Sequence, residues 1–242
     1  SNNKYEYVMD LSDNAYIENI YAGASSSSMT AAKVFGSYIS MNEEYLLVSN
    51  IYGRHNTENI SSGYVVIYKI VNNSFVFQKR LFPDYNDSTS NQRFGVNHIV
   101  TDNYIFISQG YKRLDDGTGL KNYSVINIYK KNSSDNWEFL KKVIVPMGQA
   151  VQDAFRIYNN NLGNSITGTS MQRVQTKMSF KNNKLYVGLP GIKSKDNTTN
   201  YVGGAIVLRN DNDQWNIIKT LYSPIQTSQY EHFGRAIDVD DD

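Results

Sequence analysis

The amino-acid sequence repeats itself, and this repeat limits what the chain can fold into more than any other feature. The stretch VFGSYISMNEEYLLVS, at 34–49, aligns without a gap with RFGVNHIVTDNYIFIS, at 93–108. A third and weaker copy runs from Leu162-Gly163 to Gly191 and carries roughly a dozen extra residues. The stretch HFGRAIDVDDD, at 232–242, opens the same unit once more. A period of roughly 60–70 residues indicates a tandem array of one structural unit.

Each unit continues with an apolar run, a polar turn and a further run that opens on an aromatic residue. The apolar runs are GYVVIYK, YSVINIYK and GAIVLR, and the turns after them are rich in Asn, Ser and Asp. The runs that follow the turns open on Phe75, Trp137 and Trp215. Because Tyr, Phe, Val and Ile favour strands while Asn and Asp favour turns, each unit is predicted to hold four short strands.

Four short antiparallel strands repeated at this period are typical of a β-propeller blade. The run Tyr64–Tyr68 is apolar throughout and does not alternate, as expected for a strand buried on both faces between neighbouring blades. We therefore predict an all-β fold, a β-propeller of four-stranded antiparallel blades, with a β-sandwich or a β-solenoid as the alternatives. The Gly of each Phe-Gly pair is expected to bend the chain with a positive φ, and the Phe to wedge between adjacent blades.

A single propeller domain is expected to take up the whole chain. The predicted parts are a partial blade and connection at 1–33, blade units at 34–92, 93–160 and 161–231, and the start of a further blade at 232–242. About three full blades do not close a ring, which needs at least four, so we expect the chain to be part of a larger ring. The remainder is expected as a second polypeptide or as further residues, beginning with a strand that resembles YLLVS or YIFIS.

The order of these motifs resembles FG-GAP repeats, the blades of integrin α-subunit-like propellers and of many bacterial surface proteins. The resemblance covers about Val34 to the C-terminus and includes LYVGLPG, at 185–191, as the nearest match to the Gly-Ala-Pro element. The corresponding stretches LVSNIYG and FISQGYK depart from that element. The family is a scaffold for adhesion and for ligand and partner binding, and it includes sugar-binding propellers. The resemblance therefore implies a secreted or cell-surface binding module, although a shared fold does not carry function with it.

Charge and composition argue against several classes of function. Lys plus Arg number 24 and Asp plus Glu 23, so the net charge of +1 lacks the basic excess of a nucleic-acid-binding protein. No apolar run approaches the roughly eighteen residues that a membrane span needs. Cysteine is absent, which excludes disulfides, thiolate metal sites and cysteine nucleophiles.

No catalytic or metal-binding constellation emerges from the sequence. Asp115 and Asp116 are adjacent carboxylates in a predicted loop, and a general acid–base pair would have to converge from separate elements. The histidines lack the spacing of metal ligands: His55, His98 and His232. The alternating carboxylates of DVDDD, at 238–242, would suit Ca²⁺, but we interpret the corresponding turns of the other units as short solvated hairpins. We expect no catalytic residue, no metal site and no cofactor, with Ca²⁺ as the minor alternative.

The connections between the second and third strands of each unit are the candidate binding site. They are predicted as loops at 50–63, 109–122 and 190–204, and a propeller places such loops on one face. Loops held by a rigid scaffold often carry function, and Tyr and Arg are enriched at binding hot spots. The candidate partner-binding residues are Tyr52, Arg54, Tyr111, Arg113 and Lys193.

We therefore expect a non-catalytic binding or adhesion module that binds a protein partner through this loop face, outside the cell or on its surface. A carbohydrate-binding propeller lectin with a glycan ligand is the alternative, and a propeller-based hydrolase is the less favoured third reading.

Overall fold

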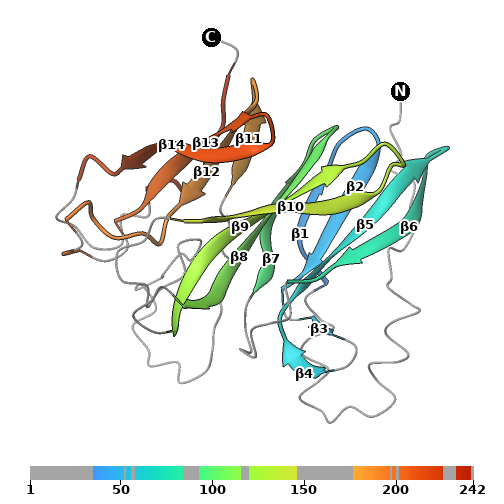
Figure 1. Cartoon of the computed structure of the whole chain (residues 1–242), viewed down its shortest axis with the longest axis horizontal. Coiled ribbons are helices and arrows are strands. Elements are labelled where there is room, and N and C mark those ends of the chain that lie inside the picture. The colour runs from blue at the N-terminus through green and yellow to red at the C-terminus, as the bar shows by residue number, and fades with distance from the viewer. Residues whose placement is uncertain are drawn as a thin grey trace, which may run out of the picture.

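A computed structural model shows that the described residues form three four-stranded antiparallel sheets and one two-stranded hairpin (Figure 1). The structure describes residues 35–51, 53–55, 58–83, 93–115, 120–145, 177–196, 198–199, 202–225 and 233–240. The described part is all-β, which confirms the predicted fold class and the predicted four-stranded antiparallel units. No helix able to span a membrane is present among these residues.

The strands of each sheet follow one another along the chain. The first sheet contains β1 (Phe35–Met41), β2 (Tyr45–Asn50), β5 (Tyr64–Val71) and β6 (Ser74–Leu81), and the small hairpin contains β3 (Arg54–His55) and β4 (Glu58–Ser61). The second sheet contains β7 (Phe94–Val100), β8 (Tyr104–Asp115), β9 (Leu120–Lys131) and β10 (Trp137–Ile144). The third contains β11 (Met178–Lys181), β12 (Lys184–Leu189), β13 (Gly204–Asp211) and β14 (Gln214–Tyr222).

The sheets lie side by side in chain order, with their first strands close to one another. Strand β7 contacts β1, β2 and β5 of the first sheet and also β11 of the third. Strands β10 and β14, the last strands of the second and third sheets, are in contact as well. The second sheet therefore packs between the other two, and Figure 1 shows it in that central place.

The last strand of every sheet carries a β-bulge at the same position. Pairing with the third strand skips one residue in each sheet, namely Gln78, Leu140 and Ile218. A bulge increases the local twist and interrupts the ladder, which makes an outer strand a poorer template for another chain. The repeat seen in the sequence therefore extends to the irregularities of the backbone.

The Gly residues of the described Phe-Gly pairs have the predicted positive φ, whereas the predicted burial of the Phe is complete only at Phe94: Phe35 is half-buried and Phe233 is 42% exposed. Gly36, Gly95 and Gly234 have φ values of 83°, 87° and 83°, a region that residues with a side chain rarely adopt. Phe94 is fully buried in the core between the first and second sheets. A Cβ on Gly95 would come within 2.9 Å of Ser49 Cβ, so the chain approaches the first sheet closely here.

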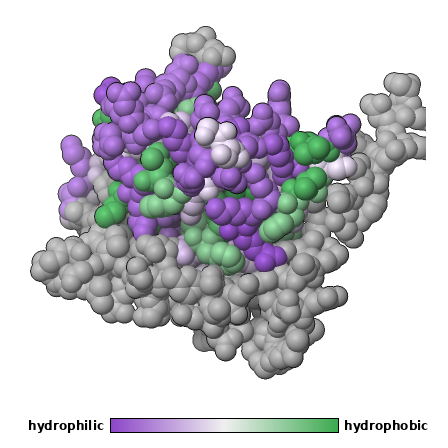
Figure 2. Space-filling view, turned by 45° about the vertical axis from the view of Figure 1, so that its right-hand side comes forward, coloured by the Kyte–Doolittle hydropathy of each residue, from purple (hydrophilic) through white to green (hydrophobic). Residues whose placement is uncertain are grey.

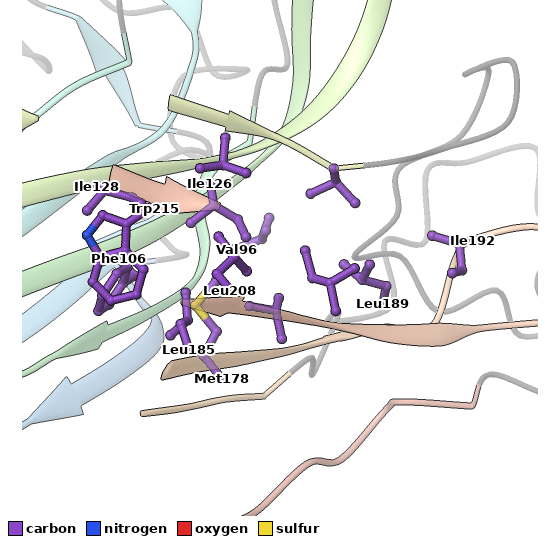
Figure 3. Packing of buried hydrophobic residues seen from close by; sticks show 14 residues of the cluster. Val96, Phe106, Ile126, Ile128, Met178, Leu185, Leu189, Ile192, Leu208 and Trp215 are labelled. Atoms are coloured by element: carbon purple, nitrogen blue, oxygen red, sulfur yellow. The ribbon is translucent and has the colours of Figure 1, made fainter. Parts of the chain in front are cut away.

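Two apolar cores fill the spaces between the sheets. The core between the first and second sheets includes Tyr45, Leu47, Val65, Ile67, Phe94, Ile105, Ile107, Tyr129 and Trp137. The core between the second and third sheets includes Phe106, Ile126, Ile128, Leu185, Val187, Leu189, Ile206, Leu208 and Trp215 (Figure 3). Because both faces of the second sheet are covered, the successive residues Ile105, Phe106 and Ile107 of β8 are all buried. Residues Tyr64–Tyr68 of β5 are likewise buried without alternation, as their sequence predicts.

The same kind of polar contact joins the first sheet to the second and the second sheet to the third. In the second sheet, Asp135 accepts hydrogen bonds from the Tyr45 hydroxyl and the Lys69 ammonium of the first sheet. In the third sheet, Asp213 accepts a bond of 2.6 Å from the Tyr104 hydroxyl and one of 2.6 Å from Lys130 Nζ. We call each arrangement an acid clamp: a Tyr and a Lys of one sheet that hold an Asp of the following sheet.

The turn geometry explains why the clamp uses Asp. Asp135 and Asp213 have φ values of 61° and 65°, in the left-handed region where Asn, Asp and Gly are tolerated best. The Lys ammonium is the first cause, and the Tyr hydroxyl the second, that holds the pKa of each carboxyl below its usual value. Each Asp therefore remains ionised and opposite its cation at neutral pH.

Replacing Asp213 by Asn should lower the free energy of unfolding by about 1 kcal/mol. Asn is compatible with the left-handed turn, so the change removes the charge and leaves the backbone conformation. Lys130 and Asp213 have side chains that are 44% and 32% exposed, so solvent weakens the ion pair, and the Asn oxygen can still accept from the Tyr104 hydroxyl; the loss of the carboxylate charge from both contacts therefore has a modest effect.

Urea unfolding of both proteins measures this difference. Asp211→Asn is the matched control, because Asp211 pairs with Arg209 on the surface of a single sheet. The control should shift the stability by less than about 0.5 kcal/mol. Equal losses in the two variants would contradict a role for Asp213 between sheets.

Candidate partner-binding site

The first two connections between second and third strands are β-ribbons, which corrects the prediction of loops. In the first sheet, β3 and β4 form a hairpin in which Arg54 pairs with Ser61 and His55 with Glu58. In the second sheet, β8 and β9 continue past the sheet, with Lys112 opposite Tyr123. The polar residues of these segments obscured the strands, because their sequences show no regular apolar alternation.

The ribbon of the second sheet is the longer of the two. After a register shift between Gln109 and Lys112, pairing continues through Arg113 with Asn122 to Asp115 with Leu120. Ser124 closes the base of the ribbon, since its hydroxyl donates to the Gly110 carbonyl over 2.9 Å. The ribbon is therefore a paired extension of β8 and β9 beyond the sheet.

The third connection is a loop that is fixed by its own hydrogen bonds. The Gly203 amide donates to the Ile192 carbonyl over 3.0 Å, and the Ser194 amide donates to the Thr199 carbonyl over 2.8 Å. Ile192 and Ser194 are both buried. Lys193 lies between these two anchored residues and is half-buried, so its backbone position is well defined.

A carboxylate stabilises the turn next to Lys193. Asp196 accepts hydrogen bonds from the Ser194 and Thr198 hydroxyls and from the Thr198 amide. The Ser194 bond is the largest cause, followed by the Thr198 bonds, that lowers the pKa of Asp196 to about 2. Asp196 is therefore ionised and engaged in its own turn, which is a structural role.

The structure places four of the candidate binding residues on these connections. Arg54 lies in β3, Tyr111 and Arg113 lie in the extended part of β8, and Lys193 lies in the third connection. Tyr52 is outside the described residues. Figure 1 shows the hairpin of β3 and β4 and the far ends of β8 and β9 on the same side of the molecule. In each sheet the connection and the hairpin turns that carry the acid-clamp residues lie at opposite ends of the strands.

The described histidines and the described carboxylate that the sequence offers for catalysis lie in different strands. His55 lies in β3 and Asp115 at the end of β8, whereas His98 is buried between β7 and the first sheet. Asp116 and His232 are outside the described residues. No group of three His, Asp or Glu side chains arranged to hold a metal ion occurs in the described part of the chain.

Acidic residues near the turns carry no calcium-like arrangement in the described segments. Asn42 caps its hairpin by accepting from the Glu44 and Tyr45 amides at 3.0 and 2.8 Å. Thr101 makes the corresponding contact with Tyr104 at 2.9 Å. The side chains of both turns are thus used in local hydrogen bonds, as expected for short hairpins.

The acid clamps are the residues that sequence reasoning missed. A recognisable signal was present, because an Asp stands two residues before each Trp that opens a last strand, at Asp135 and Asp213. The partners Tyr45 and Tyr104 also occupy equivalent places in the repeat. The sequence did not reveal that these residues of successive units are in contact. Tyr45 and Asp135 are 90 positions apart in the chain, and Tyr104 and Asp213 are 109 positions apart.

Comparison with known proteins leaves the chain without an assigned relative. No protein-family model matches the chain. A search of curated proteins also finds no match.

Proposed function

We propose that the three sheets are consecutive blades of a β-propeller of the FG-GAP type, and that the chain is a binding or adhesion module. The observation that carries the architecture is the acid clamp, which recurs with the same residue types between the first and second and between the second and third sheets. A contact that repeats from sheet to sheet generates a regular array, which is how a propeller is built. The rest of the ring comes from further residues or from a second polypeptide.

The proposed binding face is the end of the array that carries the connections. The backbone of the two ribbons is held by strand pairing, and that of the third connection by its hydrogen bonds. A preorganised surface loses less conformational entropy when it binds. The proposed ligand is a protein outside the cell or on its surface, and the residues proposed to contact it are Tyr52, Arg54, Tyr111, Arg113 and Lys193.

Two ribbons and a compact loop make three different surfaces, and this favours a protein ligand over a repeated sugar site. A lectin with one pocket per blade would present equivalent residues on every sheet. A protein partner with an irregular surface has no such requirement. A glycan array distinguishes the two: binding to a defined sugar above background would support the lectin, and its absence would remove it.

Changing Tyr52, Arg54, Tyr111 and Arg113 together to Ala should weaken binding to the protein partner at least tenfold. Tyr and Arg are the residue types most enriched at binding hot spots, where one side chain contributes about 2 kcal/mol or more. A panel of purified extracellular proteins, immobilised and probed with the purified chain, identifies the ligand and measures the affinity of both forms.

The control changes Lys141 and Lys219 to Ala on the outer strands β10 and β14, away from the connections. This control should bind as the unchanged chain does, and circular dichroism should show the same strand content for all forms. Undiminished binding by the fourfold variant would move the site to another surface.

A further inference from the structure

Each sheet has a face directed toward the next sheet, and its residues occupy the same register positions throughout. We call this the following face. In the first sheet it carries Tyr45, Leu47, Val65, Ile67 and Lys69, and in the second Tyr104, Phe106, Ile126, Ile128 and Lys130. The equivalent residues of the third sheet are Lys184, Tyr186, Ala205, Val207 and Arg209. They alternate with Leu185 and Leu208, which face the second sheet, so they lie on the opposite side of β12 and β13.

Residues 233–240 begin to cover the following face of the third sheet in the way that β7 covers that of the first. The Phe94 amide donates to the Ser62 carbonyl over 2.9 Å, and the Phe233 amide donates to the Val202 carbonyl over 3.2 Å. Gly95 approaches Ser49, and Gly234 approaches Gly188, whose Cβ would lie 1.9 Å from the Gly234 carbonyl oxygen. At Phe233 and Gly234 the chain therefore makes the contacts that Phe94 and Gly95 make, although Phe233 is 42% exposed and Phe94 is buried.

The opposite end of this face carries two basic side chains, one of which is paired with a neighbouring Asp. Lys184 and Arg209 are paired across the strands, at the places where the first two sheets have Tyr and Lys. Lys184 is half-buried and Arg209 is exposed. Arg209 contacts Asp211, whose side chain is 50% exposed. The clamp position of the third sheet thus offers two cations where the other sheets offer a hydroxyl and one cation.

We propose that this face is a docking surface for the four-stranded sheet that residues 233–240 begin, and that this sheet carries a carboxylate two residues before the aromatic residue of its last strand. The inference rests on the proposed propeller arrangement and specifies the chemistry of the next interface. The carboxylate occupies the left-handed position of the last hairpin turn, as Asp135 and Asp213 do, and accepts bonds from Lys184 and Arg209.

A second copy of the chain does not meet this requirement. The residue of the first sheet at the equivalent turn position is Asn73, with a φ of 59°, two residues before Phe75. An amide carries no charge to balance Lys184 and Arg209. The first sheet of another copy therefore lacks the acid that both described interfaces contain.

An extended chain tests the surface directly. Asp242 is in register with Asn103, so a copy of residues 104–145 joined after Asp242 supplies the second, third and last strands with Asp135 and Trp137. We expect the added segment to fold against the third sheet. In limited proteolysis its half-life should be at least ten times that of the same segment added to a chain, here called the host, that carries Lys184→Glu and Arg209→Glu. Asp135→Asn in the copy alone should also speed cleavage.

A second variant of the chain tests whether the clamp residues of the first two sheets can replace Lys184 and Arg209. Lys184→Tyr with Arg209→Lys recreates the clamp partners of the first two sheets and should protect the added segment at least as well as the unchanged host. The unextended chain with each pair of changes should unfold at the same urea concentration as the original. Equal cleavage of the added segment in the unchanged and charge-reversed hosts, whether fast or slow, would overturn the proposal. The measurement reports the protection of the added segment and not ligand binding, so its failure is distinguishable from failure of the proposed binding function.

Discussion

Replacing Trp215 by Ala is expected to lower the free energy of unfolding by about 3–5 kcal/mol, a larger loss than the removal of an acid clamp should cause. Trp215 is 1% exposed and lies in the core between the second and third sheets (Figure 3). Its ring meets Phe106 and Tyr104 edge to face, with centroid distances of 4.9 and 5.3 Å. Removal leaves a cavity bordered by aromatic rings and β-strands, which cannot collapse to fill it.

Urea unfolding followed by circular dichroism measures the loss, and Trp215→Phe is its control. The Trp215 Nε1 atom is buried without a hydrogen-bond partner among the described residues, so Phe removes no bond. The Phe variant should lose about 1–2 kcal/mol, the value of the smaller ring volume alone. A loss below about 1 kcal/mol for the Ala variant would show that the third sheet does not depend on this interface for its stability.

The repeat was the most informative part of the sequence because it reported on packing as well as on local structure. Phe94 and Gly95 were predictable from their recurrence: a large apolar side chain needs a buried position, and Gly suits a bend with positive φ. The double-sided burial of Tyr64–Tyr68 followed from the absence of alternation. These inferences use only neighbours along the chain and the general rule that apolar strands are covered on both faces.

Contacts that depend on the order of the sheets were out of reach of that reasoning. Asp135 reads as an ordinary turn residue until the first sheet brings Tyr45 and Lys69 to it. The extension of β8 to Asp115 was equally hidden, since most residues that pair in the ribbon are polar, such as Arg113 with Asn122, and they form no apolar run or alternation. Ribbons that extend beyond a sheet and polar contacts between repeats carry weak sequence signals, because no regular hydrophobic pattern specifies them.

The surface also shows why apolar content alone is a poor guide to a binding site in this protein. The face drawn in Figure 2 is mostly hydrophilic, with hydrophobic patches set among polar residues. Exposed apolar side chains such as Phe77 and Phe139 belong to the outer strands β6 and β10. Arg80 lies 5.7 Å from the Phe77 ring and Lys142 lies 5.9 Å from the Phe139 ring, so a basic side chain covers part of each. These contacts, with the bulges, fit strands at the rim of the fold.

One buried group should make the stability of the protein depend on pH. His98 is fully enclosed between β7 and β1, where its Nδ1 lies 2.6 Å from the Ser40 hydroxyl and its Nε2 lies 3.3 Å from the Tyr38 carbonyl. The Tyr38 ring meets the imidazole edge to face at 5.0 Å. These partners suit a neutral imidazole that accepts from Ser40 and donates to Tyr38. Burial is the main cause that lowers the pKa of His98 from 6.5 to about 3, and the Tyr38 contact opposes it.

Acidification from pH 7 to pH 4 should therefore destabilise the protein by about 3 kcal/mol through His98 alone. Below pH 6.5 the unfolded chain binds a proton at this residue while the folded chain does not, so stability falls until the pH reaches the folded pKa of about 3. The clamp carboxylates affect stability in a lower pH range, because the pKa values of Asp135 and Asp213 are held below 3.8.

Urea unfolding of the unchanged protein and of His98→Gln at several pH values isolates the contribution of the histidine, since Gln does not titrate. The variant should be less stable at pH 7 and should lose about 3 kcal/mol less between pH 7 and pH 4. Parallel pH profiles for the two proteins would show that His98 is protonated in the folded state or lies open to solvent.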